Sequence, residues 1–229
     1  MSYNIAVPEI VPEKNEVLRY LGYGGQELSE RLSADIDYCI KTAAERFTPR
    51  FVIRKFPLIK REWGIEVSGT NLTLTGEDIK ALLRDCDQCV IMAATLGLEI
   101  DRFISYTAQT NVGHSVITDA AATAAVEVLC DYLEAQIERI EAPSALTRRY
   151  SCGYGDLPLG LQPKILMALS AQKLIGLNCS SSYIMIPRKS VTAIMGITTI
   201  KSKENKKDCY GCDLKDRCSF RKAETGCGA

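Results

Sequence analysis

The segment SVITDAAATAAVEVLCDYLEAQIERI, residues 115–140, is the longest helical pattern in this 229-residue chain. Alanine, which has the highest helix propensity, recurs through its first half, and Pro143 follows its end. The segment therefore predicts one long helix. The patterns on either side of it predict the elements that pack with it.

Strand and helix patterns are mixed before the long helix. The expected elements are, in order, helices at 13–23 and 26–47, strands at 50–59, 63–69 and 71–76, a helix at 77–85, a strand at 88–97 and a helix at 98–108. Thr48-Pro49 ends the second helix, because the residue before a proline disfavours the helical conformation. The strands at 63–69 and 71–76 are joined around Gly69, which indicates a hairpin.

A helix and two strands are expected after the long helix. The helix begins at Gln162-Pro163, since proline suits the first helical position, and the strands cover 180–187 and 190–200. Hairpin signals without regular βαβ alternation predict an α+β fold, with a mixed, largely antiparallel twisted sheet and flanking helices. At Lys201 the composition changes. We therefore expect a domain at 1–200 and a polar linker with a short cysteine-rich C-terminal tail at 201–229.

Charge and hydropathy exclude several classes of partner. Basic and acidic residues balance at 28 each, which gives no bulk electrostatic argument for nucleic acid or an anionic membrane. No apolar run reaches the ~18 residues that a membrane span needs. The first residues also lack the pattern of a secretory signal. We expect a cytoplasmic protein with no nucleic-acid or membrane partner.

Four cysteines near the C-terminus have the spacing of a metal site. They follow the pattern C-x2-C-x5-C-x8-C and are Cys209, Cys212, Cys218 and Cys227. Two residues between thiolates let one turn present both sulfurs to one metal, and four thiolates suit zinc or an iron–sulfur cluster. The spacing does not decide between the two metals. The alternative is a tail that is rich in cysteine without binding metal.

Residues for acid–base or nucleophilic catalysis are not apparent. His114 is the single histidine, no G-x-S-x-G elbow occurs, and neither dinucleotide nor phosphate-loop glycine patterns are present. Cys86 and Cys89 have metal-ligand spacing, but the buried-strand pattern after them favours core cysteines. The sequence predicts no catalytic residue.

The stretch RRYSCGYGDLPLG, residues 148–160, has two physical interpretations. Arg149 has the geometry to bind a carboxylate, Tyr154 can stack or hydrogen-bond, and backbone near Gly153 and Gly155 can approach a ligand closely. Equally, glycine and proline clusters mark turns, and this one precedes the helix at Pro163. The residues alone leave the two interpretations evenly balanced.

The order of elements around this stretch resembles a known family. R-x3-G-Y at Arg149, Gly153 and Tyr154 is similar to the S-adenosylmethionine (AdoMet) signature of the activation domain of cobalamin-dependent methionine synthase. The helix AVEVLCDYLEAQIER at 125–139 and the segment SSSYIMIPRKSVTAIMGI at 180–197 resemble the family's long helix and closing strand. The resemblance covers roughly residues 115–197. It is closer to the stand-alone activation proteins than to the terminal domain of a full-length synthase.

The resemblance implies a set of cofactor-binding residues. They are Arg149, Tyr150, Ser151, Cys152, Gly153, Tyr154 and Glu127. At 100° per residue, Glu127 shares a helix face with Asp131 and Glu134, a face that without the family is better interpreted as solvated. The sequence departs from the family at Gly155, where the family has proline. The family's ligand-contacting acid near the N-terminus and its tyrosine beyond the closing strand have no counterpart that the sequence identifies.

The implied function is reactivation of a cobalamin enzyme. In this family the module binds AdoMet and docks over cobalamin held by a methionine synthase or related corrinoid protein. An electron donor such as flavodoxin reduces inactive cob(II)alamin, and the sulfonium methyl traps the product as methylcobalamin. The protein then acts as part of a methyltransferase system, only with its partner, and supplies binding and orientation. An iron–sulfur tail would be able to relay the electron. The alternative function is a non-catalytic adaptor that binds a partner through its metal tail.

Overall fold

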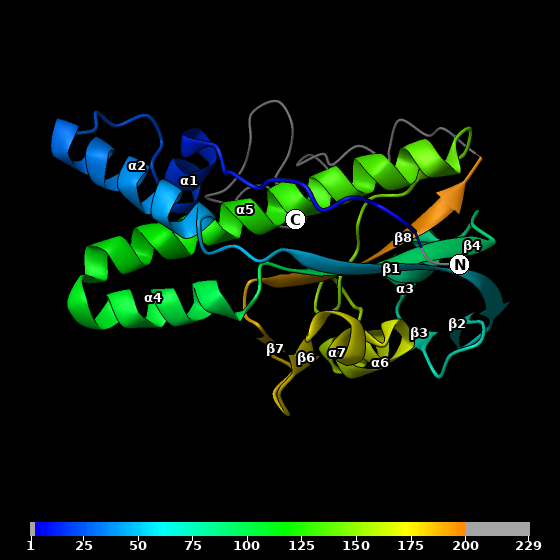
Figure 1. The fold of residues 1–229 in the computed structure, drawn as a ribbon. Helices are drawn as coiled ribbons and strands as arrows, with labels where there is room; N and C mark the ends of the chain where they lie inside the picture. The colour runs from blue at the N-terminus through cyan, green and yellow to red at the C-terminus, as the bar shows by residue number, and fades with distance from the viewer. Residues whose placement is uncertain (1–2, 200–229) are drawn as a thin grey trace.

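The computed structural model describes residues 3–199, which form helices packed on both faces of a central sheet (Figure 1). The helices are α1 (Lys14–Tyr20), α2 (Glu30–Ala44), α3 (Glu77–Leu82), α4 (Leu98–Thr110), α5 (Val112–Glu141), the 3-10 turn η1 (Leu159–Leu161), α6 (Gln162–Leu169) and α7 (Ala171–Ile175). The strands are β1 (Arg50–Arg61), β2 (Gly64–Val67), β3 (Thr73–Leu74), β4 (Gln88–Thr95), β5 (Ala145–Leu146), β6 (Asn178–Cys179), β7 (Met185–Ile186) and β8 (Ser190–Thr198).

The main sheet is antiparallel at every pairing, in the order β3-β2-β1-β4-β8-β5. Strand β4 lies in the middle, where Ile53 of β1 faces Met92 and Ala193 of β8 faces the same residue. The predicted α+β class and antiparallel sheet are therefore confirmed, as is the hairpin around Gly69, which joins β2 and β3.

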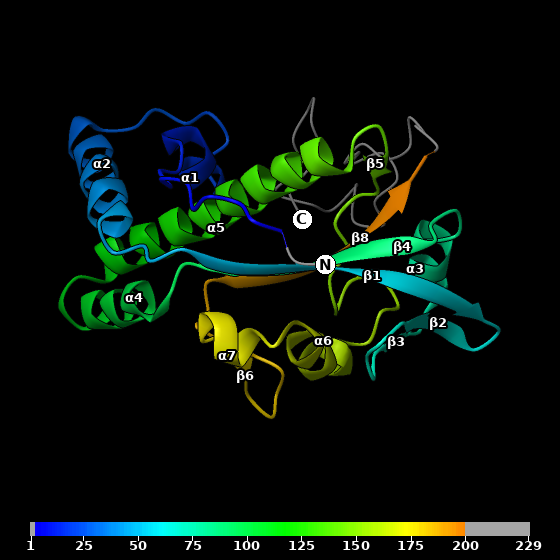
Figure 2. The ribbon, with the colours of Figure 1, turned by 45° about the vertical axis from the view of Figure 1, so that its right-hand side comes forward.

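Alternate residues of the central strands belong to two separate cores. Val90, Met92 and Ala94 pack with α1, α2, α4 and α5 on one face. Cys89 and Ile91 pack with α3, α6 and α7 on the other (Figure 2). Because both faces of β4 are buried, its sequence is a continuous apolar run rather than an alternating one. Cys89 is thus a core residue, and burial raises the pKa of its thiol to about 12.

Helix α5 spans the length of the first core. Asn111 caps its start, with its side-chain oxygen accepting a hydrogen bond from the backbone N–H of His114 at 3.1 Å. At its other end, Glu141 accepts hydrogen bonds from the hydroxyl of Tyr3 at 2.6 Å and from Nζ of Lys55 at 2.7 Å. These contacts fix the helix to the N-terminal arm and to β1.

One predicted strand is much shorter in the structure. The segment 180–187 was expected to be a strand throughout, but only Met185–Ile186 pairs, with Asn178–Cys179 of β6. The residues before it form a turn, in which the N–H of Tyr183 donates to the carbonyl of Ser180 and Tyr183 has a φ of 65°. Pro187, which follows, has no N–H to donate to a ladder.

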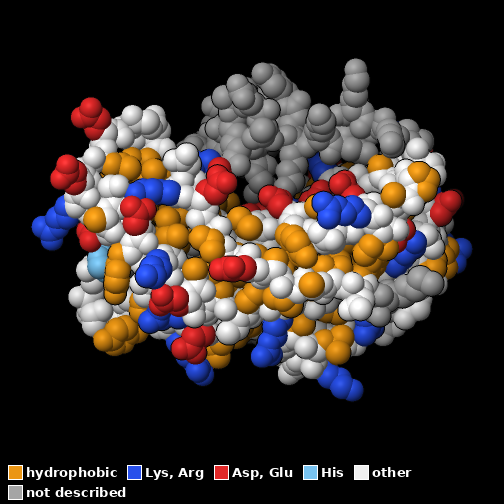
Figure 3. All heavy atoms as spheres, turned by 45° about the horizontal axis from the view of Figure 1, so that its top comes forward, with side chains coloured by type: hydrophobic (Ala, Val, Ile, Leu, Met, Phe, Trp, Pro, Cys, Tyr) orange, Lys and Arg blue, Asp and Glu red, His pale blue; other side chains and the backbone are white. Residues whose placement is uncertain are grey.

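The surface agrees with the balanced composition. In the view of Figure 3, basic and acidic side chains are interspersed over the face of the molecule. Among residues 3–199, no helix combines the length and apolar character of a membrane span.

Candidate functional site

The arginine of the R-x3-G-Y motif lies at the edge of the sheet. After β5, the chain continues along β8: the N–H of Thr147 donates to the carbonyl of Gly196, and Tyr150 forms a bridge with Ile194. Arg149 lies between these two contacts, under the middle of α5. Local pairing with β8, rather than a glycine turn, therefore positions the arginine.

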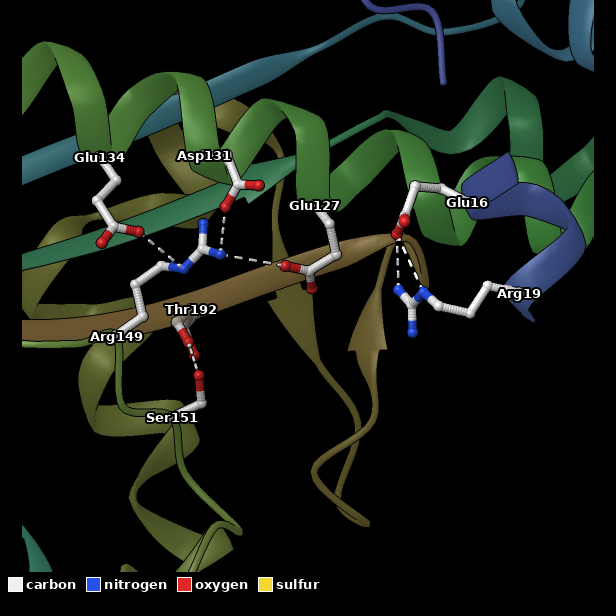
Figure 4. Close-up of polar contacts among 8 residues, drawn as sticks. All are labelled: Glu16, Arg19, Glu127, Asp131, Glu134, Arg149, Ser151 and Thr192. Atoms are coloured by element: carbon white, nitrogen blue, oxygen red, sulfur yellow. Dashed lines mark hydrogen bonds and ion pairs between the residues drawn. The ribbon is translucent and has the colours of Figure 1, made fainter. Parts of the chain in front are cut away.

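The guanidinium of Arg149 is surrounded by three carboxylates of α5 (Figure 4). Its Nη2 lies 2.6 Å from Asp131 and 3.3 Å from Glu127, and its Nε lies 3.3 Å from Glu134. We call these four residues the Arg149 cluster. The three acids recur at helical spacing, so one face of α5 presents them together, as the helical projection predicts.

The Arg149 cluster is electrostatically unusual because its cation is buried. The side chain of Arg149 is 3% exposed. Burial acts to lower its pKa, but Coulombic interaction with Cys130 and the three carboxylates outweighs burial, and the pKa lies above its ordinary value. Nη1 is buried without a hydrogen-bond partner among the described residues. A buried guanidinium donor without a partner is costly, so this atom is a candidate contact for a ligand.

The rest of the motif lies on other parts of the structure. Tyr150 points to the second core, where its hydroxyl donates to Asp78 of α3 at 3.1 Å, and burial together with this hydrogen bond raises its pKa to about 12. Cys152 is buried in the same core, and burial raises the pKa of its thiol to about 12. Ser151 donates to the carbonyl of Thr192 at 2.7 Å. Of the predicted residues, Arg149 and Glu127 are brought into contact.

The glycines after Ser151 form a compact turn against α3. Gly153 donates to the carbonyl of Leu157, and Gly155 adopts a φ of +50°. Asp156 accepts from the backbone N–H groups of Glu77, at 2.5 Å, and Asp78, so it caps α3. Proline requires a φ near −65°, so the proline that the resembled family has at this position does not fit the backbone at Gly155. The side chain of Tyr154 is exposed.

Helix α1 contributes residues to this region that the sequence did not identify. Glu16 forms an ion pair with Arg19 at 2.9 Å, and the pair lies beyond Glu127 in Figure 4. Tyr20, the last residue of α1, interacts electrostatically with both Glu127 and Glu16, so α1 ends beside the Arg149 cluster. The pKa of Tyr20 is raised, mainly by burial. No local pattern predicts this, because α1 and α5 are about a hundred residues apart.

The predicted metal ligands lie outside the described residues. Cys209, Cys212, Cys218 and Cys227 all follow residue 199. Within 3–199, no group of three or more histidine, cysteine, aspartate or glutamate side chains has a geometry that could hold a metal ion.

Comparison with known proteins gives a match at the level of structure. No family model and no curated protein matches the sequence. A crystal structure of the MetH reactivation domain bound to AdoHcy superposes with a TM-score of 0.61, covering 88% of this chain and 81% of that chain. The two are 17% identical, and the likeness establishes that the chain has the fold of a methionine synthase activation domain.

Proposed function

We propose that this protein binds AdoMet and acts as an activation subunit for a cobalamin-dependent methionine synthase or a related corrinoid protein. The observation that supports it most is the contact between Arg149 and Glu127 in a fold that the reactivation domain of MetH shares. The family resemblance implies both residues as cofactor-binding residues, and they come from two different elements, α5 and the segment after β5.

The Arg149 cluster fits the amino-acid end of AdoMet. That end has a carboxylate, an ammonium and a sulfonium within a few bonds. Arg149 supplies a fixed guanidinium for the carboxylate, and Glu127 supplies a part-buried carboxylate for the cationic groups. Glu16 is our candidate for the N-terminal acid, since α1 ends beside Glu127.

The chain's own residues have a positioning role in this proposal. Bound AdoMet supplies an electrophilic methyl group, and the cobalamin belongs to the partner. Arg149 and Glu127 hold the amino-acid end, so that the methyl group keeps a fixed place relative to the docked partner. No proton transfer is required of these residues.

Calorimetric titration of the purified protein with AdoMet tests the binding step. We expect saturable binding, and we expect Glu127→Gln to weaken it about tenfold, which corresponds to one charge-assisted hydrogen bond. Glu27→Gln removes the same charge from an exposed loop and serves as the matched control. A folded wild-type protein that binds no AdoMet, alone or with the partner, contradicts the proposal.

A reactivation assay tests the finer claim. A cobalamin-bearing methionine synthase without its own activation domain is mixed with this protein, AdoMet and reduced flavodoxin. We expect the absorbance of cob(II)alamin to convert to that of methylcobalamin only when this protein is present. If the protein binds AdoMet but no partner tested shows this conversion, the result favours the alternative function, a non-catalytic adaptor.

A further inference from the structure

Arg149 has few donors left for a ligand in the structure described here. Its Nη2 contacts two carboxylates and its Nε contacts a third, while Nη1 is buried without a partner. A bidentate contact with a ligand carboxylate needs two adjacent guanidinium nitrogens. Nη1 and Nη2 provide that pair only if a carboxylate leaves Nη2.

The two carboxylates on Nη2 differ in how readily they can leave. Asp131 makes the shorter contact, 2.6 Å, and its side chain is 63% exposed. Glu127 lies at 3.3 Å and its side chain is 25% exposed. An exposed carboxylate is rehydrated when it leaves an ion pair, whereas a part-buried one loses its partner with less compensation from water. Asp131 is therefore the carboxylate that exchanges at lower cost.

We infer that Asp131 occupies the ligand-carboxylate position of Arg149 in the absence of ligand, and that the carboxylate of the incoming ligand displaces it. This inference rests on the proposed function. Exchange of one carboxylate for another keeps the buried guanidinium paired throughout, so Arg149 is not left as an isolated buried charge. The incoming carboxylate also gives Nη1 its missing acceptor, which Asp131 does not. Asp131 thus determines how strongly the site prefers a ligand with a carboxylate.

A thermodynamic cycle between the ligand carboxylate and Asp131 tests the inference. The ligands are AdoMet and its decarboxylated analogue, which keeps the sulfonium and the amine, and the measured quantity is the ratio of their Kd values. In Asp131→Asn, the ligand carboxylate competes with a neutral amide in place of the charged Asp131 side chain. We expect the preference for AdoMet over the analogue to increase about tenfold, the size of one charge-assisted hydrogen bond.

Glu134→Gln is the matched control, because it removes the same charge from the same helix face. Glu134 contacts Nε and leaves Nη2 unchanged. If a ligand carboxylate merely senses the negative field of α5, the two variants will raise the preference equally. We expect Glu134→Gln to change it less than threefold. Asp85→Asn, an exposed loop substitution, shows the scatter of the measurement.

The outcomes separate this inference from the proposed function. AdoMet binding with an unchanged or lowered preference in Asp131→Asn overturns the role of Asp131 and leaves AdoMet binding intact. Equal effects of Asp131→Asn and Glu134→Gln also overturn it. Absence of AdoMet binding in the folded wild-type protein removes the proposed function, and this inference with it. Thermal unfolding of each variant confirms that the protein is folded.

Discussion

Gly155 is the residue at which the chain departs from the activation-domain pattern that its sequence resembles, and the structure explains the departure. A Cβ atom there would meet the carboxylate of Asp78 and the hydroxyl of Tyr150, and a φ of +50° is unfavourable for residues with side chains. The left-handed conformation alone costs about 1–2 kcal/mol. We expect Gly155→Ala to lower the free energy of unfolding, measured by urea titration, by at least that amount.

Gly24→Ala is the matched control for that substitution. A Cβ atom at Gly24 has nothing within 4 Å, and its φ is not in the positive region. We expect a change in stability of less than ~1 kcal/mol, because alanine restricts the unfolded chain without straining the folded one. If Gly155→Ala is as mild as Gly24→Ala, the turn adapts and the steric explanation for the missing proline is wrong.

Arg149 requires caution as a target for mutation, since it is both a proposed ligand contact and a structural cation. Arg149→Ala removes the buried cation that Glu127, Asp131 and Glu134 share, and two of these carboxylates, Glu127 and Glu134, are only 25% and 21% exposed. We expect a loss of about 3 kcal/mol in the free energy of unfolding, typical of removing one partner from a buried ion pair. A fall in melting temperature measures it. Unchanged stability would mean that the cluster is solvated and that Arg149 is not a structural cation.

At the scale of elements, the two ends of α5 make different contacts. Its C-terminal end is held to the rest of the domain by the hydrogen bonds that Glu141 accepts from Lys55 and Tyr3. These hydrogen bonds outweigh the effect of burial, so the pKa of Glu141 lies below its ordinary value of 4.5. A lowered pKa in the folded state means that the contribution to stability is complete above about pH 4.5 and is lost as the pH falls through the folded value. Acidification should therefore loosen this end of the helix.

The variant Glu141→Gln tests this contribution. We expect this substitution to lower the free energy of unfolding by about 2 kcal/mol at pH 7, because hydrogen bonds to a charged group are stronger than those between neutral groups. Its loss relative to wild type should shrink as the pH falls below 4.5. Urea unfolding between pH 3 and pH 7 measures both effects. Glu138→Gln, an exposed neighbour on the same helix, should show neither; an equal effect there would assign the loss to helix charge instead of these contacts.

The elements that could be predicted from the sequence are those with strong local patterns. Strand β4 is a continuous apolar run, and α5 combines alanine content with a proline beyond its end, so both were predicted close to their true bounds. Residues 180–187 share the apolar composition of a strand, yet the turn at Ser180–Tyr183 limits pairing to two residues. Local composition does not specify which backbone groups find a partner.

The candidate site was also predictable only where it depends on a local pattern. The shared face of Glu127, Asp131 and Glu134 follows from helical periodicity alone. That Arg149 faces them follows from the pairing of 147–150 with β8, which is a long-range contact without a local signal. The sequence favoured a solvated face on physical grounds, whereas the structure buries the arginine against it. Only the resemblance to a family linked Arg149 to Glu127 on this face, because helical periodicity does not specify what a helix face contacts.

At the scale of the whole molecule, the six-stranded sheet with a core on each face organises residues 3–199, and the two-stranded sheet of β6 and β7 precedes β8 in the sequence. We therefore propose that the domain at 1–200 folds without the cysteine-rich tail, and that the tail contributes metal binding. Truncation after residue 200 should leave the melting temperature within a few degrees of the full chain. It should also remove any bound zinc or iron.

Anaerobic purification of the full chain, followed by metal analysis and a visible spectrum, measures the metal directly. A coloured protein with iron and sulfide supports an electron relay, and a colourless one with stoichiometric zinc supports a structural site. Cys209→Ser should abolish binding in either case, because it removes one of four thiolate ligands. Cys179→Ser, a part-exposed thiol of β6, should leave it unchanged. A full chain that binds neither metal overturns the prediction for the tail, whereas loss of folding on truncation overturns the domain boundary.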